Sequence, residues 1–242
     1  MESNIVPLQH NSFPDIKNIN ISGNPTLITP NKEDMISLRF TFADSEDVDL
    51  YVKFIRNAVK LFRSTEYYKI YKAHLIQLGL DRCQILGNLP VDTDDKNTSV
   101  TIEMNHVIIT IFDIAYMICE TVLKTYGSIT TFELVGLLIK EHAEHRVPLV
   151  MMCKSVHQAY HADPLFFVHP KQVFGYWWEL VYKYKLGISP QIASKIVYYC
   201  KKCKEVSATN ANGLLQVAQD VQEWGSYNNG YIDFNFNWSD DF

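Results

Sequence analysis

Two histidines near the middle of the chain have a spacing that could support chemistry. His157 and His161 are four residues apart within Lys154–His161, a segment predicted to be helical, so both imidazoles leave the same helix face. That spacing lets two nitrogen atoms bind one divalent metal ion. Helix surfaces also produce such pairs by chance, so the spacing alone leaves both interpretations open.

A second polar group lies at the end of a predicted strand. Val100–Glu103 alternates and is rich in β-branched residues, which predicts a strand that passes into a loop near Asn105 and His106. A neutral imidazole can accept a proton from water, and a metal ion beside a phosphate can polarise it. These are the parts that phosphodiester hydrolysis requires. The two-residue period of a strand predicts that Glu103 points with Asn105 and away from His106.

These two segments together resemble the HNH endonucleases, also described as the His-Me finger or ββα-metal fold. Ile102–His106 (IEMNH) is similar to the first motif of that family, and Leu149–His161 (LVMMCKSVHQAYH) is similar to its second strand and metal-binding helix. The resemblance is closest to phage-encoded members, in which a helical insert separates the motifs, and it covers roughly residues 50–185. It implies a mostly helical α+β protein with a small ββα-metal core embedded in helices.

The resemblance also implies a role for each polar residue of the motifs. His106 corresponds to the catalytic general base, and His157 and His161 correspond to two ligands of a single metal ion. Asn105 stands at the third ligand position, with Glu103 as a supporting carboxylate. Because an amide oxygen suits a hard cation better than Zn²⁺, the expected cofactor is Mg²⁺ or Mn²⁺.

Two departures from the family pattern leave other functions open. Asn105 replaces the usual His or Asp, and Pro148 stands where the family often has an Asn that orients the base. The principal expectation is a metal-dependent endonuclease that hydrolyses nucleic acid. The alternative is a catalytically weakened protein of the same fold that acts as a DNA-binding or protein-interaction component of a virus. A purely structural component of a viral particle is the third interpretation.

The elements that must position these residues follow from the hydrophobic pattern. Residues 1–44 predict an irregular arm with a short strand near Ser37–Phe42, and residues 45–205 predict a helical domain that contains the HNH-like core at about 100–162. Residues 206–242 predict one helix and an acidic, aromatic tail. A buried strand is expected at Pro148–Met152, and helices are expected over 45–62, 64–78, 111–126, 130–145, 154–161, 170–185, 190–204 and 211–223.

Basic side chains are concentrated in two segments. Residues 51–80 hold six basic side chains and one acidic one, and residues 168–205 hold seven lysines and two glutamates. Residues 206–242 contain five acidic side chains and no Lys or Arg, so they account for the net charge of −5. These basic segments have two possible explanations: they are helix faces exposed to solvent, or they bind phosphate groups. The residues expected to bind nucleic acid, in the first place DNA, are Lys53, Arg56, Lys60, Arg63, Lys195, Lys201 and Lys202.

The C-terminal residues Asn237–Phe242 resemble the acidic tails ending in Phe on bacterial and phage single-strand-binding proteins. This resemblance implies a protein partner bound through the tail, or a contact between the tail and the protein's own basic face. A terminal segment that packs on the domain is the alternative.

Composition restricts the remaining possibilities. With 242 residues, 47% hydrophobic and 20% charged, the chain has an ordinary globular composition. No apolar window is long enough for a membrane span, and the N-terminus shows no secretion signal, so the expected location is the cytoplasm, that of the host cell for a phage protein.

Five scattered cysteines fit reduced thiols, and Cys200 and Cys203 lack the second pair that zinc needs. His142 and His145 are expected to be solvated near a helix end, and Tyr176–Trp178 to lie mostly in the core.

Overall fold

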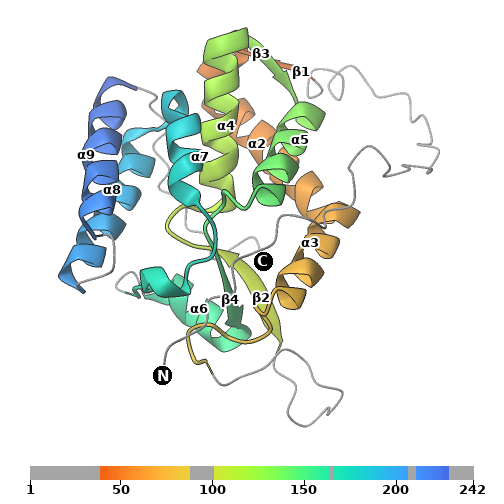
Figure 1. Cartoon of the computed structure of the whole chain (residues 1–242). Helices are drawn as coiled ribbons and strands as arrows, with labels where there is room; N and C mark the ends of the chain where they lie inside the picture. Colours follow the sequence, from red (N-terminus) through yellow and green to blue (C-terminus); the bar gives the residue numbers. More distant parts are fainter. Residues whose placement is uncertain (1–38, 88–100, 164–165, 207–210, 229–242) are drawn as a thin grey trace.

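The structure is a computed structural model that describes residues 39–87, 101–163, 166–206 and 211–228 (Figure 1). Most of the predicted N-terminal arm and the acidic aromatic tail lie outside the described residues. The described part is a mostly helical α+β fold, as the sequence predicts. Two small two-stranded sheets lie at opposite ends of the helical layer in Figure 1.

Three helices form the centre of the fold. Helix α4 (Ile111–Tyr126) is apolar nearly all round and packs against α2 (Val48–Ser64) and α5 (Thr131–Ala143). It begins at a capping box in which Thr110 and Asp113 satisfy each other's backbone N–H groups. It ends at Gly127, whose φ of 78° is the left-handed conformation that closes a helix. The capping box predicted at Thr130 likewise opens α5.

The remaining helices surround this centre. Helix α3 (Glu66–Gln77) contacts α5, while α8 (Pro190–Glu205) and α9 (Ala211–Tyr227) pack side by side (Figure 1). A short helix α7 (Trp177–Lys183) lies between two 3-10 turns, η3 (Pro170–Gln172) and η4 (Lys185–Gly187). A further 3-10 turn, η2 (Ala43–Glu46), precedes α2.

The single helix predicted over 170–185 is therefore wrong. Phe174 forms a β-bridge with Leu149, and the next residue, Gly175, has a φ of 103°. A Cβ at Gly175 would lie 2.1 Å from the carbonyl oxygen of Val147, so the backbone passes too close there for any other residue. This close approach interrupts the helix and makes α7 start at Trp177.

Both sheets are antiparallel pairs. The short strand predicted near Ser37–Phe42 is β1 (Arg39–Thr41). It pairs with β3 (Ser128–Thr130), a strand that the hydrophobic pattern did not predict, because three residues are too few to show a period. Strand β2 (Ile102–His106) pairs with β4 (Leu149–Cys153), so that His106 is opposite Leu149 and Glu103 is opposite Met152. The strand predicted at Val100–Glu103 thus starts two residues later and extends through His106.

The β2–β4 sheet has two different faces. On the inner face, Met104 and Met151 belong to the main hydrophobic core with the central helices. On the outer face, Val150 and Met152 form a small cluster that contacts Val156 and Tyr160 of helix α6 (Lys154–Ala162). The two antiparallel strands followed by α6 make a ββα unit, but an arrangement of elements does not by itself determine a function.

Candidate functional site

A cavity of about 730 Å³ lies along strand β2 and is lined by residues of both faces of the β2–β4 sheet. Helix α6 contributes aromatic and imidazole groups to its wall, and α2, α3 and α8 contribute cationic and phenolic groups. Its polar lining includes Arg63, Tyr68, Lys72, Glu103, Asn105, His157, His161 and Lys195. The sequence-predicted residues Glu103, Asn105, His106, His157 and His161 therefore all border one cavity.

Glu103 and the two α6 histidines form a hydrogen-bonded chain. The Glu103 carboxylate lies 2.5 Å from Nδ1 of His157, and Nε2 of His157 lies 2.8 Å from Nε2 of His161. Because a carboxylate accepts, we assign the proton of His157 to Nδ1, which leaves its Nε2 to accept from Nε2–H of His161. Burial and the neighbouring His157 lower the pKa of His161, which favours this neutral arrangement.

Asn105 lies on the same outer face as Glu103, as the strand period predicts. Its side chain is buried, and Nδ2 lies 3.8 Å from the sulfur of Met152, a weak contact. The amide therefore borders the cavity without a strong hydrogen-bond partner among the described contacts.

His106 lies on the inner face and is separated from this chain by the strand itself. Its Nε2 lies 3.0 Å from Nε2 of His142 on α5, and both rings are buried. Burial, together with His142 and Arg63, lowers the pKa of His106 well below its usual value. Although His106 borders the cavity, the structure joins its imidazole to His142 and not to His157 or His161.

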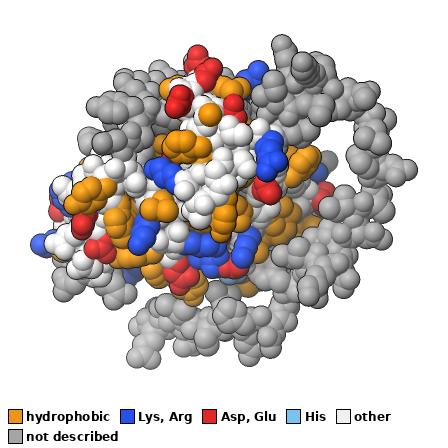
Figure 2. Space-filling model, turned by 90° about the horizontal axis from the view of Figure 1, so that it is seen from above, with side chains coloured by type: hydrophobic (Ala, Val, Ile, Leu, Met, Phe, Trp, Pro, Cys, Tyr) orange, Lys and Arg blue, Asp and Glu red, His pale blue; other side chains and the backbone are white. Residues whose placement is uncertain are grey.

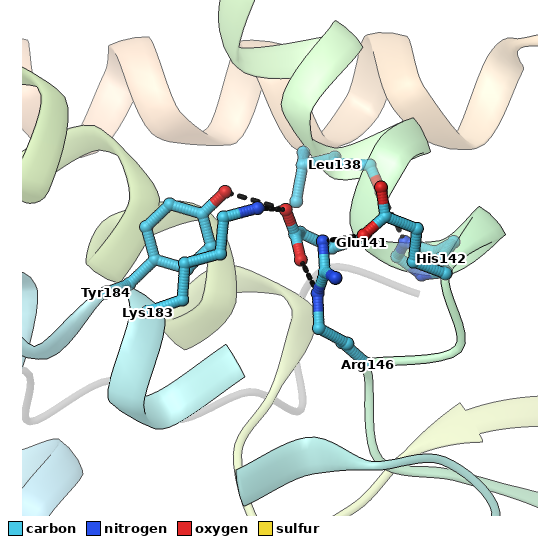
Figure 3. A network of polar contacts seen from close by, with 7 residues as sticks. Leu138, Glu141, His142, Arg146, Lys183 and Tyr184 are labelled. Carbon is cyan, nitrogen blue, oxygen red and sulfur yellow. Dashed lines mark hydrogen bonds and ion pairs between the residues drawn. The ribbon is translucent and has the colours of Figure 1, made fainter. Parts of the chain in front are cut away.

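The expectation that His142 is solvated is wrong. His142 is fully buried, its Nδ1–H donates to the carbonyl oxygen of Leu138 at 2.7 Å, and burial lowers its pKa to about 4. The adjacent Glu141 is also fully buried, and its carboxylate binds three donors (Figure 3): Arg146 at 2.6 Å, Lys183 at 2.6 Å and Tyr184 at 2.7 Å. Burial by itself would raise the pKa of Glu141, but these donors lower it. Sequence reasoning missed this network, since its members are far apart in the chain.

The predicted nucleic-acid-binding residues fall into two groups. Lys53, Arg56 and Lys60 are exposed on one side of α2, and the half-buried Arg63 extends this row to the cavity. On α8, Lys195 binds both oxygens of Asp113 and Lys202 binds Glu205, so their charges are compensated, whereas Lys201 is exposed.

The remaining predicted candidates are mostly structural. All five cysteines are buried and free, Cys200 and Cys203 among them. Trp177 lies in the core, but Tyr176 and Trp178 are exposed, contrary to expectation. Within the described ranges, no three His, Cys, Asp or Glu side chains are grouped so as to hold a metal ion. None of the helices in the described part of the chain combines the length and hydropathy that a bilayer crossing requires.

Comparison with known families decides between the interpretations of this site. Residues 9–224 match the family of bacteriophage G278-like virion proteins, a match that spans the described fold from β1 into α9. The chain belongs to this virion protein family. No curated protein and no solved structure matches it significantly.

Membership of the virion protein family corrects the principal expectation. The family is one of virion proteins, so the resemblance to HNH endonucleases and the nuclease and hydrolase activities that it implied are wrong. The phage origin suggested by that resemblance is confirmed. The motifs misled because a strand pair followed by a helix with two histidines is a short pattern, and in this virion protein its histidines lie on two faces of the sheet.

Proposed function

We propose that this chain is a structural component of the bacteriophage particle, held there by contacts with other virion proteins. The observation that carries the proposal is the family match over residues 9–224. It favours a place in the virion over the host-cell cytoplasm that the sequence led us to expect.

An apolar surface at the β1–β3 end supports a role in protein contacts. Three aromatic side chains are exposed there: Phe42 at 50%, Tyr126 at 77% and Phe132 at 66%. Phe42 is close to Tyr126 because Thr41 pairs with Ser128 and the N–H of Phe42 donates to the carbonyl oxygen of Gly127 at 3.0 Å, and Phe132 follows the other end of β3 at the start of α5. Figure 2, viewed from above, shows hydrophobic side chains among Lys, Arg, Asp and Glu. Aromatic side chains within a polar surrounding are typical of protein interfaces.

The proposal is tested on purified particles. After a high-salt wash, mass spectrometry should detect this protein at a constant ratio to a known capsid protein, while a phage protein made only for replication should be absent. Loss of the protein in the wash at the same rate as the replication protein would contradict the proposal.

A matched pair of variants tests the aromatic surface. Phage supplied with Phe132→Ser should incorporate less of the protein, because an exposed anchor of the interface is removed. Tyr198→Ser, which removes an aromatic side chain exposed to 46% on α8, should be incorporated normally. Equal incorporation of both variants would show that the β1–β3 end is not the contact.

The row of basic side chains on α2 favours a second role, contact with the phage nucleic acid. Lys53, Arg56 and Lys60 lie on one exposed side of the helix, at a spacing that allows several phosphates to be contacted together. Lys53→Glu with Lys60→Glu should abolish DNA binding at low salt, whereas Lys201→Glu should leave most of it. Unchanged binding by the double variant would contradict this role. The tail as a binding site for a protein partner stays a prediction, because it lies outside the described residues.

A further inference from the structure

The outer face of the β2–β4 sheet carries a pair of imidazoles whose nitrogens converge. Nε2 of His157 and Nε2 of His161 are 2.8 Å apart, one helical turn from each other on α6. Ligand nitrogens bound to the same metal ion at about 2.1 Å are separated by roughly 3 Å or slightly more. The two rings therefore need only a small adjustment to point both lone pairs at one ion.

Glu103 determines which nitrogen of His157 is available. Its carboxylate accepts the Nδ1 proton, so the Nε2 lone pair of His157 is directed toward His161. A carboxylate on the far nitrogen of a histidine is the arrangement that orients a metal-binding imidazole and raises its basicity. The side chain of His157 is 20% exposed and His161 is exposed beside the cavity, so an ion can enter from solvent.

We propose that His157 and His161 form a binding site for a borderline transition-metal ion such as Zn²⁺, Ni²⁺ or Co²⁺, with Glu103 as the residue that positions His157. Binding of the ion requires His161 to change tautomer: its single proton leaves Nε2 and Nδ1 takes one up from solvent, so that both Nε2 lone pairs face the ion and both rings stay neutral. Two imidazole nitrogens suit these ions better than Mg²⁺ or Mn²⁺, which prefer oxygen, so the proposal reverses the cation preference expected from Asn105. Water or a group from a neighbouring molecule completes the coordination.

The bound ion has a structural consequence for α6. This helix has no fully buried residue of its own and starts without a side-chain cap. Its described contacts with the sheet region include Val156, Tyr160, the bond between Glu103 and His157, and the N–H of Lys154, which donates to the carbonyl oxygen of Thr101 at 3.2 Å. An ion bound by both histidines links two successive turns of α6 to each other, and the bond between Glu103 and His157 links the same part of the helix to β2. Because the ion binds the folded state and not the unfolded one, it stabilises the folded state by mass action.

Titration calorimetry at pH 7.5 on the full chain without an affinity tag tests the site. Wild-type protein should bind Ni²⁺ and Zn²⁺ with one ion per chain and show no heat with Mg²⁺, and its melting temperature should rise with Ni²⁺. His161→Gln and His157→Gln should each weaken Ni²⁺ binding at least about 100-fold and remove the rise in melting temperature. Glu103→Gln should weaken binding by about 10-fold, because both ligands remain but His157 is no longer oriented.

His74→Gln is the matched control. His74 also lies beside a second histidine, His145, but their rings are stacked with an interplanar angle of 5° and centroids 6.2 Å apart, so their nitrogens do not converge. Ni²⁺ binding by this variant should equal that of the wild type. Equal binding by wild type and His161→Gln would overturn the site, and an unchanged affinity in Glu103→Gln would overturn the role of Glu103. These results are independent of whether the protein is found in the particle.

Discussion

The two faces of the β2–β4 sheet carry the same pair of groups in opposite environments. On the inner face, the Nε2 atoms of His106 and His142 are 3.0 Å apart, and on the outer face those of His157 and His161 are 2.8 Å apart. Both inner rings are buried, and His142 contacts the aromatic rings of Phe62 and Tyr71, although His106 also borders the cavity. In the outer pair, His161 is exposed and His157 is half-buried beside the Glu103 carboxylate. Two histidines in contact are therefore a structural element in one place and a candidate binding site in the other, and solvent access makes the difference.

The inner pair is held in a rigid setting. Nδ1–H of His142 binds the carbonyl oxygen of Leu138, and the adjacent Glu141 connects the end of α5 to Arg146 and to Lys183 and Tyr184 of the α7 region (Figure 3). In the outer pair, His157 binds the Glu103 carboxylate and the ring of His161 contacts Tyr160, and both histidines lie on the short helix α6. Substitutions on the inner side should therefore change stability, and substitutions on the outer side should change binding.

The largest effect is expected at Glu141. Glu141→Ala removes the buried carboxylate, leaves Lys183 and the hydroxyl of Tyr184 without this partner and leaves Arg146 with Glu144 alone, so the free energy of unfolding should fall by about 3–5 kcal/mol. Urea denaturation measures the change. Glu144→Ala is the control, because Glu144 pairs with Arg146 at the surface and its removal should cost less than about 1 kcal/mol. Equal losses of stability in the two variants would show that the buried network contributes no more to the free energy of unfolding than the surface ion pair does.

His142→Ala should have the next largest effect on stability. It leaves a cavity beside Phe62 and removes the partner of buried His106, which should cost about 3 kcal/mol. His142→Phe should recover part of this loss, because it refills the space without restoring the hydrogen bonds. A thermal melt of each variant is the measurement, and a His142→Ala protein as stable as the wild type would contradict the assigned role of the inner pair.

A smaller effect is expected from pH. Burial lowers the pKa of His142 to about 4, whereas an unfolded chain has a histidine pKa near 6.5, so the unfolded state binds more protons between these values. Stability should be constant above about pH 6.5 and decrease as the pH falls toward 4, by about 2 kcal/mol at pH 5 for His142. His142→Phe should flatten the stability profile of urea midpoints between pH 7 and 5. A profile as steep as that of the wild type would assign the pH dependence to other groups.

The smallest effect on stability is expected on the outer face. His161→Gln, measured with a chelator present, should change the free energy of unfolding by less than about 0.5 kcal/mol, because the side chain is exposed and glutamine keeps a polar group in its place. A loss of stability similar to that of His142→Ala would show that the two histidine pairs contribute equally to the stability of the fold.

Much of the fold follows from local patterns in the sequence. The bounds of α4, the capping box at Thr130 and the start of α6 at Lys154 were predicted because caps and helical periodicity depend on residues within a few positions. The two-residue period of a strand correctly separated Glu103 from His106.

Only the tertiary structure decided which of these residues meet and which are buried. His106 meets His142 because β2 and the end of α5, 36 residues apart, pack on the same side of the sheet, and Gly175 ends a predicted helix because the backbone of Val147 passes beside it. Short-range patterns determine where a helix or strand forms, whereas burial depends on contacts between distant segments that no local pattern encodes. For this reason the sequence identified five histidines of the protein as candidates for chemistry or solvation, and the fold placed His106 and His142 in the core, left His145 and His157 half-buried and exposed His161.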